Sequence, residues 1–233
     1  MPPTHIVVIG GTSGIGLACA KLLANRGATI TVVGRTRAKL DAAVTEIGGL
    51  AKGEVADAGD RAALDGLFER AAPIDHLVIA ASGGAGAGSF RSLAEDGLRR
   101  GFEGKFWVHW NATQAVLRRL AQDGSVVLIT AASSRLANPG TSGLAAINGA
   151  LERMVPSLAR ELAPRRVNAV SPGVVETPWW ADKPVEMFEA QSRKAPLGRP
   201  GRAEEIAHAV AFLIENTFVT GVVLDVDGGL HLT

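Results

Sequence analysis

Short apolar runs alternate with longer amphipathic stretches along most of the chain. The runs are rich in β-branched residues and are continuous rather than alternating, as expected for strands that are buried on both faces of a sheet. The predicted strands are His5–Ile9, Thr29–Val33, Leu50–Val55, His76–Ala80, Val126–Thr130, Val167–Val170 and Val222–Val226.

Between these runs, apolar residues recur about every three or four positions, which is the spacing of one face of a helix. Pro156 falls inside the fifth predicted helix and is expected to kink it. The alternation of strands and helices predicts βαβ units, and hence an α/β fold of the Rossmann type. Such a fold is a doubly wound parallel sheet of about seven strands, with helices on both faces and ligands at the carboxyl ends of the strands. The predicted helices are Ile15–Arg26, Arg37–Ile47, Arg61–Arg70, Leu98–Ala121, Leu144–Ala163 and Ala203–Ile214.

Composition limits the classes of protein that fit. The 233 residues contain no internal linker, so we expect one domain over residues 1–233. A hydrophobic content of 47% argues against disorder, and a net charge of +1 gives no electrostatic footprint for nucleic acid or membrane. The single Cys19 excludes an internal disulfide and a cysteine-based zinc cluster, and it favours a reducing, cytoplasmic environment.

The apolar runs are all shorter than the ~20 residues of a membrane span. The chain start, from Met1 to Gly11, enters a predicted strand directly, so no signal peptide is expected.

A glycine-rich turn, GGTSGIG, joins the first predicted strand to the first predicted helix. Gly10 permits the tight turn, Gly14 allows the backbone to approach a pyrophosphate, and Gly16 allows helix and strand to pack closely. The helix N-terminus adds free N–H groups and a partial positive charge. This context predicts a dinucleotide site, although a purely structural turn is the alternative. The expected contacts are Gly10, Thr12, Ser13, Gly14, Ile15 and Gly16.

The end of the second predicted strand indicates which nucleotide is bound. An acidic residue about 20 residues after the turn would bind a ribose 2′-hydroxyl. This chain instead has Arg35, Thr36 and Arg37. A guanidinium pairs with a 2′-phosphate, which a carboxylate would repel. We therefore predict NADP(H) rather than NAD(H), the alternative being that both arginines are solvated.

Three blocks in order resemble the short-chain dehydrogenase/reductase family over nearly the whole chain. GGTSGIG is similar to the family's T-G-x-x-x-G-x-G, with Ile9 where threonine usually stands. Leu162–Pro178 and Gly201–Gly229 are similar to the segments around its sixth strand and its last helix and strand. The resemblance implies further cofactor contacts: Asp57 at the adenine; Ala80, Ser82 and Gly83 in the loop similar to N-N-A-G; and Pro172, Gly173, Val175 and Thr177 at the nicotinamide.

The family's catalytic residues are replaced in this sequence. The family uses Ser, a Y-x-x-x-K pair on one helix, and an Asn on the preceding long helix. Alignment with that pattern puts Leu144 at the Tyr, Asn148 at the Lys and Ala131 at the Ser, with the Asn near Gly101. The chain contains no tyrosine. In the family the phenol donates a proton, and the lysine lowers the phenol's pKa. Leu144 has no proton to donate, so the usual mechanism is predicted to be absent.

Other groups are candidates for the missing chemistry. Ser133 and Ser134 follow the fifth predicted strand and can orient a substrate oxygen, although a hydroxyl is a poor acid and a capping role is the alternative. Asn148 is expected to hold the nicotinamide ribose. A bound water is another possible source of the proton.

Two residues of the preceding predicted helix are further candidates. Lys105 follows Gly101 by one turn, where an ammonium would stabilise a developing alkoxide; a solvated lysine is the alternative. His109 lies one turn further and either shares this position or faces a partner helix together with Trp107 and Trp110.

The segment Thr177–Pro200 corresponds to the mobile substrate lid of the family. It carries Trp179, Trp180, Met187 and Phe188 between prolines. If it closes, the pocket is apolar and suits a bulky carbonyl compound or a ring. The alternative is that the tryptophans are buried against a neighbouring subunit.

Three hypotheses for function follow. The first is an NADP(H)-dependent oxidoreductase that acts on a carbonyl or alcohol, or on a polarised double bond, with an atypical active site and a small, apolar substrate. The second is a catalytically silent NADP(H)-binding sensor or assembly protein. The third is an isomerase or lyase with a structural cofactor. By resemblance, Leu98–Ala121 and Leu144–Ala163 would pair with a second copy in a homodimer or homotetramer.

Overall fold

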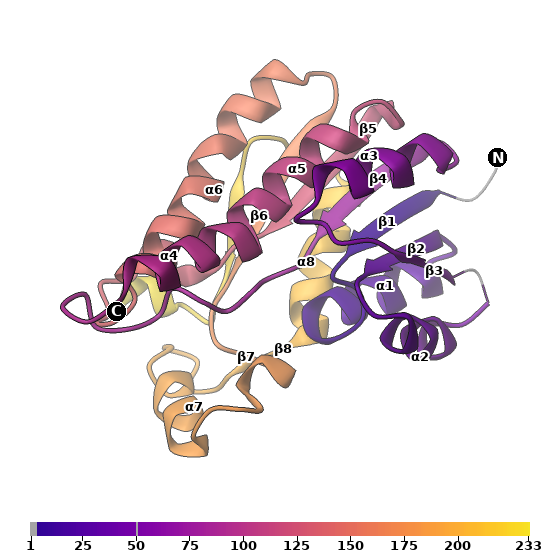
Figure 1. Cartoon of the computed structure of the whole chain (residues 1–233). Helices are drawn as coiled ribbons and strands as arrows, with labels where there is room; N and C mark the ends of the chain where they lie inside the picture. Colours follow the sequence, from indigo (N-terminus) through magenta and orange to yellow (C-terminus); the bar gives the residue numbers. More distant parts are fainter. Residues whose placement is uncertain (1–3, 50) are drawn as a thin grey trace.

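A computed structural model describes residues 4–49 and 51–233. Seven parallel strands form one sheet in the order β3-β2-β1-β4-β5-β6-β9 (Figure 1), which confirms the predicted Rossmann-type fold. Leu50, the predicted first residue of the third strand, and the segment Met1–Pro3 lie outside the described residues. The strands are β1 (His5–Ile9), β2 (Thr29–Gly34), β3 (Ala51–Val55), β4 (Ile74–Ile79), β5 (Leu120–Ile129), β6 (Arg166–Pro172) and β9 (Val223–Val226).

The central strand β1 shows why the sequence pattern is continuous. All five of its residues are buried: Ile6 and Val8 pack on one face of the sheet, and Val7 and Ile9 pack on the other. Helices α1, α2 and α8 cover the first face, and α3, α5 and α6 cover the second. The helices are α1 (Gly14–Asn25), α2 (Arg37–Ile47), α3 (Arg61–Arg70), α4 (Glu95–Gly101), α5 (Val108–Val116), α6 (Ser142–Glu161), α7 (Val185–Ser192) and α8 (Ala203–Glu215).

The order of the strands shows where a ligand-binding crevice is expected in this fold. From β1 the chain winds outward to β2 and β3, and then returns to add β4 on the opposite side of β1. The crossover helices on either side of this point lie on opposite faces, so the carboxyl ends of β1 and β4 border a crevice of the kind that binds ligands in doubly wound sheets. The glycine-rich turn and the loop after β4 both start at this point.

The helix predicted at Leu98–Ala121 is wrong at both ends and is not a single α-helix. The structure has α4, then a π-helical segment η1 (Phe102–Trp107), then α5. Glu95 and Asp96 in the first turn favour the earlier start, because acidic groups stabilise a helix N-terminus. The prediction ran too far because Leu120, buried at 4% exposure, fits a helical spacing equally well, whereas its backbone pairs with β4.

The segment after β6 contains elements that the sequence did not predict. β7 (Val175–Glu176) and β8 (Gly201–Arg202) form a separate two-stranded parallel sheet. Between them lie a short 3-10 turn, η3 (Pro178–Trp180), and α7. These elements stand below the main sheet in Figure 1, so the predicted lid segment is a structured excursion between β6 and α8.

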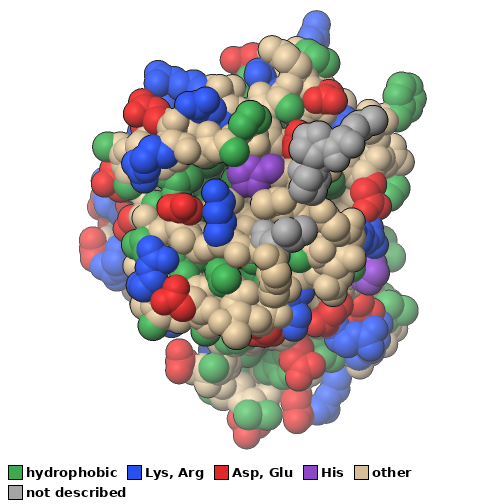
Figure 2. Space-filling model, turned by 90° about the vertical axis from the view of Figure 1, so that its right-hand side faces the viewer, with side chains coloured by type: hydrophobic (Ala, Val, Ile, Leu, Met, Phe, Trp, Pro, Cys, Tyr) green, Lys and Arg blue, Asp and Glu red, His purple; other side chains and the backbone are tan. Residues whose placement is uncertain are grey.

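Helix α6 continues on both sides of Pro156, so this proline does not end the helix. Within the described residues, no helix has both the length and the apolar character needed to cross a bilayer. Basic and acidic side chains are interspersed over the face in Figure 2, in keeping with the small net charge.

Candidate active site

The turn between β1 and α1 has a backbone that requires glycine. Gly10 and Gly14 have φ angles of +78° and +52°, in the left-handed region. A Cβ on Gly10 would lie 2.7 Å from the backbone nitrogen of Ala81, and a Cβ on Gly16 would lie 2.2 Å from the carbonyl oxygen of Gly10. The turn therefore lies directly against the chain that leaves β4, and α1 packs closely on the turn, as the spacing of the glycines predicted.

The same turn also meets the segment after β6. A Cβ on Gly14 would lie 3.3 Å from Cβ of Thr177. Ser13 precedes α1, and its side chain makes no capping hydrogen bond, which leaves the first-turn N–H groups free for an anion. Thus Thr177, 163 residues away in sequence from Gly14, borders the predicted phosphate site.

The two arginines after β2 differ in their surroundings. Arg37 donates from Nη1 to the carbonyl oxygen of Gly53 at 3.3 Å and pairs with Asp41 at 3.7 Å. Arg35 is exposed and makes no hydrogen bond or ion pair with the described residues. Arg35 is therefore the guanidinium that is available to a ligand.

Three further predicted contacts lie at the same edge. Thr36 is the N-cap of α2, without a side-chain capping bond. A Cβ on Gly34 would lie 3.1 Å from Cγ2 of Thr12, which places the turn next to the end of β2. The exposed Asp57 follows β3 and accepts a hydrogen bond from the backbone N–H of Gly59 at 2.9 Å.

The loop after β4 packs on η1. The Ala80 N–H donates to the Ile9 carbonyl oxygen at 2.8 Å, which holds the start of this loop beside β1. Ser82 and Gly83 are exposed, and a Cβ on Gly83 would lie 3.1 Å from Cα of Gly104. This close approach brings the loop next to Lys105.

Lys105 lies in η1 and reaches the end of β5. Its Nζ donates to the backbone carbonyl oxygen of Thr130 at 3.1 Å. Burial lowers the pKa of Lys105 to about 8, although the nearby Glu152 carboxylate acts in the opposite direction. The alternative of a solvated lysine on an exposed face is therefore wrong.

His109 faces the sheet. It is fully buried, with Nδ1 2.8 Å from the carbonyl oxygen of Lys105 and Nε2 3.1 Å from that of Ile79. Burial and the Lys105 charge lower the pKa of His109 to about 3, so the ring is neutral. Trp107 and Trp110 are about 40% exposed and lie on the other side of the helix, so the alternative that His109 faces a partner helix with them is wrong.

Asn148 on α6 is buried and only partly hydrogen-bonded. Its Nδ2 donates to Ser133 Oγ at 3.1 Å and to the Leu144 carbonyl oxygen at 2.9 Å. Its Oδ1 has no hydrogen-bond partner among residues 4–49 and 51–233, and the same holds for the buried Oγ of Ser134. Because buried polar atoms are rarely left unpaired, Oδ1 is a candidate acceptor for a ligand hydroxyl.

Gly101, the expected position of the family's Asn, has no room for a side chain. A Cβ there would lie 2.6 Å from Cδ1 of Ile147 and 2.8 Å from the carbonyl oxygen of Ala85. The first residue beyond it that reaches the end of β5 is Lys105, one turn along the helix.

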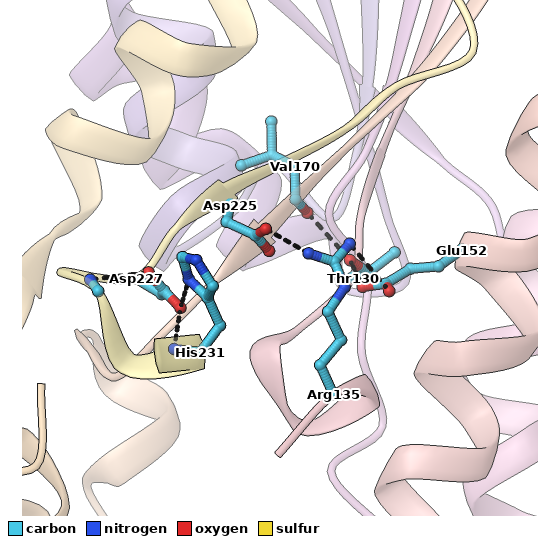
Figure 3. A network of polar contacts seen from close by, with 8 residues as sticks. Thr130, Arg135, Glu152, Val170, Asp225, Asp227 and His231 are labelled. Atoms are coloured by element: carbon cyan, nitrogen blue, oxygen red, sulfur yellow. Dashed lines mark hydrogen bonds and ion pairs between the residues drawn. The ribbon is translucent and has the colours of Figure 1, made fainter. Parts of the chain in front are cut away.

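A polar network behind these residues was missed by the sequence analysis (Figure 3). Thr130 Oγ1 donates to Glu152 Oε1 at 2.9 Å and lies 3.2 Å from the Val170 carbonyl oxygen. Arg135 pairs with Glu152 at 3.3 Å and also with Asp225. The available signal was Glu152, a charged residue on the buried face of a predicted helix, because such a carboxylate needs a partner.

A second turn supports the end of β6. Asp227 accepts hydrogen bonds from the backbone N–H of Gly229 at 2.9 Å and from N and Nδ1 of His231, both at 2.8 Å (Figure 3). A Cβ on Gly173 would lie 2.8 Å from Cα of Asp227, so this turn fixes the backbone just after Pro172. The predicted contacts at Pro172 and Gly173 thus rest on the C-terminal turn.

Val175 is 5% exposed and packs in the core with α8. Only its backbone is therefore available to a ligand.

The segment between β7 and β8 packs on itself, on the loop after β4 and on the C-terminal turn at Gly228 and Gly229. Trp179 and Trp180 meet edge to face with ring centroids 4.8 Å apart, and Trp180 lies 5.2 Å from Phe188. Lys183 Nζ lies 3.3 Å from the centroid of the Trp179 ring. A Cβ on Gly84 would lie 3.3 Å from Trp179 Nε1, so Trp179 touches the predicted site loop.

Comparison with known proteins gives the family. Residues 10–231 match the family profile described as enoyl-(acyl carrier protein) reductase. The chain is 34% identical over 232 residues to the 3-oxoacyl-[acyl-carrier-protein] reductase of Rattus norvegicus, with 97% of each chain covered. A solved short-chain dehydrogenase/reductase family protein is 33% identical with a TM-score of 0.90, over 99% of this chain and 98% of the other.

A small-chain dehydrogenase solved in complex with NADPH is also 33% identical, with a TM-score of 0.82 over 99% of this chain and 100% of the other. The protein therefore belongs to the short-chain dehydrogenase/reductase family.

Proposed function

We propose that the protein is an NADP(H)-dependent oxidoreductase that interconverts a carbonyl and an alcohol, or reduces a polarised double bond, with catalytic groups that differ from the family's usual Ser, Tyr and Lys. The observation that carries this proposal is the glycine turn at the β1/β4 switch point, closed on one side by Thr177 and flanked by Arg35, which has no partner among the described residues. Family membership and the NADPH-bound structural neighbour support it.

The cofactor is NADP(H), and the residues present fit it. Gly10 and Gly14 allow the backbone to approach a pyrophosphate, and the free first-turn N–H groups of α1 favour its charge. The exposed Arg35 would pair with a 2′-phosphate, and the unpartnered Oδ1 of Asn148 would accept a hydrogen bond from a ribose hydroxyl. When bound, the dihydronicotinamide supplies a hydride. The proposed contacts are those of the sequence analysis, with Arg35 rather than Arg37 as the main phosphate ligand.

The substrate we propose is a small molecule with a carbonyl group or a double bond conjugated to one. The curated relative acts, by its name, on a 3-oxoacyl group, and the family profile is named for enoyl reduction. These two groups share a polarised carbonyl. The apolar side chains of Trp179, Trp180 and Phe188 pack together, and Trp179 lies next to Gly84; this cluster favours an apolar substrate.

Turnover is tested by absorbance at the reduced-nicotinamide band. NADPH is mixed with the protein and ethyl acetoacetate, 9,10-phenanthrenequinone or trans-2-hexenal. We expect loss of the band with at least one of the three. Tight NADPH binding by fluorescence without any turnover would reject the oxidoreductase activity.

Replacing Arg35 with alanine is expected to weaken NADPH binding by about 10- to 100-fold and NADH binding by less than about threefold, because only NADPH carries the 2′-phosphate. Calorimetry with both nucleotides measures the difference. Arg37→Ala is the matched control, since Arg37 is already engaged by Gly53 and Asp41 and should have a smaller effect. Equal losses for the two nucleotides in Arg35→Ala would contradict the 2′-phosphate role.

One observation favours a second function. The absence of tyrosine and the presence of Leu144 at the expected proton donor fit an NADP(H)-binding sensor or assembly protein that no longer turns over. The absorbance experiment separates this function from the first.

We also propose that the chain is one domain located in the cytoplasm and that it forms a homodimer or homotetramer. The half-exposed Trp107 and Trp110 on α5 and its flank favour burial against another copy.

A further inference from the structure

We propose that Lys105 is the catalytic acid of this protein: its ammonium hydrogen-bonds the substrate carbonyl oxygen and gives it a proton. This inference rests on the proposed oxidoreductase function.

Lys105 lies at the edge of the sheet where ligands are expected to bind. Lys105 lies in the π-helical segment η1, and such segments occur frequently at functional sites. Gly104, its neighbour, touches Gly83 of the loop after β4, and Lys105 Nζ is bonded to Thr130 at the carboxyl end of β5. Nζ is thus held at the edge of the sheet where a doubly wound fold binds its ligands, one peptide unit from Ala131.

The hydrogen bonding of Lys105 is incomplete. An ammonium has three N–H donors, and within the described residues one of them is used, by the Thr130 carbonyl oxygen. Glu152 on α6 is close enough to act on Lys105, but its carboxylate is engaged by Thr130 Oγ1 and Arg135. A partly buried ammonium with two donors left over is costly for the folded state, and a substrate oxygen would satisfy one of them.

The other candidate groups are less suited to donate a proton. Ser133 Oγ accepts from Asn148, and a serine hydroxyl is a weak acid. His109 is neutral, and both its ring nitrogens face carbonyl oxygens of the protein. Burial lowers the pKa of Lys105 to about 8, which leaves it protonated at neutral pH and able to release its proton when an alkoxide forms.

The family resemblance implies a lysine on the later helix and an asparagine on the helix before it. This protein has both groups, but their places are interchanged. The lysine comes from η1 and the asparagine, Asn148, from α6. The Lys105 ammonium thus supplies a positive charge near the end of β5, although α6 has an asparagine where the resemblance implies the lysine. Because Leu144 cannot donate a proton to the substrate oxygen, Lys105 is the group that does so in this proposal.

The proposed step balances as follows. The carbonyl carbon gains the hydride that NADPH supplies, and its π bond to oxygen breaks. The oxygen forms an O–H bond with a proton from Lys105 Nζ, whose N–H electron pair stays on nitrogen as a neutral amine. Water then reprotonates the amine before the next turnover.

Lys105→Met and Lys105→Ala are expected to lower kcat with ethyl acetoacetate by about 10²- to 10⁴-fold, with NADPH affinity within about threefold of wild type. The wild-type kcat should fall as pH rises through about 8, whereas that of Lys105→Met should not. Methylammonium should restore activity to Lys105→Ala, and tetramethylammonium, which has no proton to give, should not. Lys52→Met, at an exposed lysine of β3, is the control.

Thermal unfolding gives a readout that does not depend on turnover. The pKa of Lys105 lies below the ordinary 10.5, so the unfolded state binds more protons between about pH 8 and 10.5, and wild-type stability rises across that window. Lys105→Met should therefore raise Tm by several degrees at neutral pH, and the gain should fade as pH rises from about 8 to 10.5. Lys52→Met should show neither effect.

The outcomes separate the two proposals. Wild-type turnover that Lys105→Met retains, or rescue by tetramethylammonium as well as by methylammonium, would overturn the role of Lys105 alone. An unchanged Tm at neutral pH in Lys105→Met would overturn the buried charge on which that role depends. Wild-type protein that binds NADPH but reduces none of the three probes would instead reject the oxidoreductase proposal, and the role of Lys105 with it.

Discussion

Gly16→Ala is expected to weaken NADPH binding by at least about 100-fold and to lower the free energy of unfolding by about 1–3 kcal/mol. The new Cβ would lie 2.2 Å from the Gly10 carbonyl oxygen, 2.8 Å from its carbonyl carbon and 3.0 Å from Cα of Gly11. All three atoms are backbone, so a side chain cannot rotate away, and the turn must move. Since that turn presents the phosphate-binding N–H groups, cofactor affinity and stability fall together.

Calorimetry with NADPH and chemical denaturation measure the two effects. Gly149→Ala is the matched control: it lies within α6, and a Cβ there would have no atom within 4 Å. That control should leave NADPH binding unchanged and raise stability by about 0.5–1 kcal/mol, because alanine is the better helix former. NADPH affinity in Gly16→Ala within about threefold of wild type would contradict the assignment of this turn to the cofactor.

Installing the family's proton donor should raise carbonyl reduction by about 10²- to 10⁴-fold over a variant without the phenol. The test variant combines Leu144→Tyr, Asn148→Lys and Lys105→Asn. The Leu144→Tyr change alone would supply a phenol with no ammonium nearby on the same helix, so position 148 must change as well. Lys105 is replaced because a second ammonium near position 148 would repel the first and raise the cost of burying both.

The control for this experiment is the same triple variant with Leu144→Phe. It has nearly the same size and aromatic character but no hydroxyl, so the two proteins differ in the proton donor. The reduced-nicotinamide absorbance with ethyl acetoacetate measures the ratio of their kcat values. Equal rates would mean that position 144 does not reach the substrate oxygen, and that the alignment of Leu144 with the family's tyrosine is wrong.

Most of the main sheet was predicted from the sequence, because its strands and helices follow patterns among neighbouring residues. For strand β1 and for helices α2 and α3, the predicted bounds are the same as the observed bounds. This agreement arises because a continuous apolar run and a helical spacing are properties of adjacent residues. The helix before β5 was misjudged because Leu120 suits either element, and only its pairing with Ile74 of β4 selects the strand.

Only the parts of the candidate site that depend on adjacent residues were predicted from the sequence. The glycine turn is a local signature, and the close backbone contacts at Gly10 and Gly16 agree with the tight turn and the close helix packing predicted for them. Thr130 and Arg135 lie in the segment between β5 and α6, and Glu152 lies on α6; their side chains meet only in the folded chain, so no spacing indicated them. The burial of Lys105 was likewise unpredictable, because an isolated lysine in a helix is usually exposed.

By itself, the sequence determined the order of the seven main-sheet strands along the chain, the glycine turn with arginines after the next strand, and the absence of a tyrosine from the whole chain. Each of these is a matter of which residues are present and how far apart they stand. The tertiary structure alone decided that Thr177 borders Gly14, that Arg37 is engaged while Arg35 has no partner within the described part of the chain, and that Lys105 reaches Thr130. These depend on long-range packing, which sets burial and hydrogen-bond partners between residues that the chain keeps far apart.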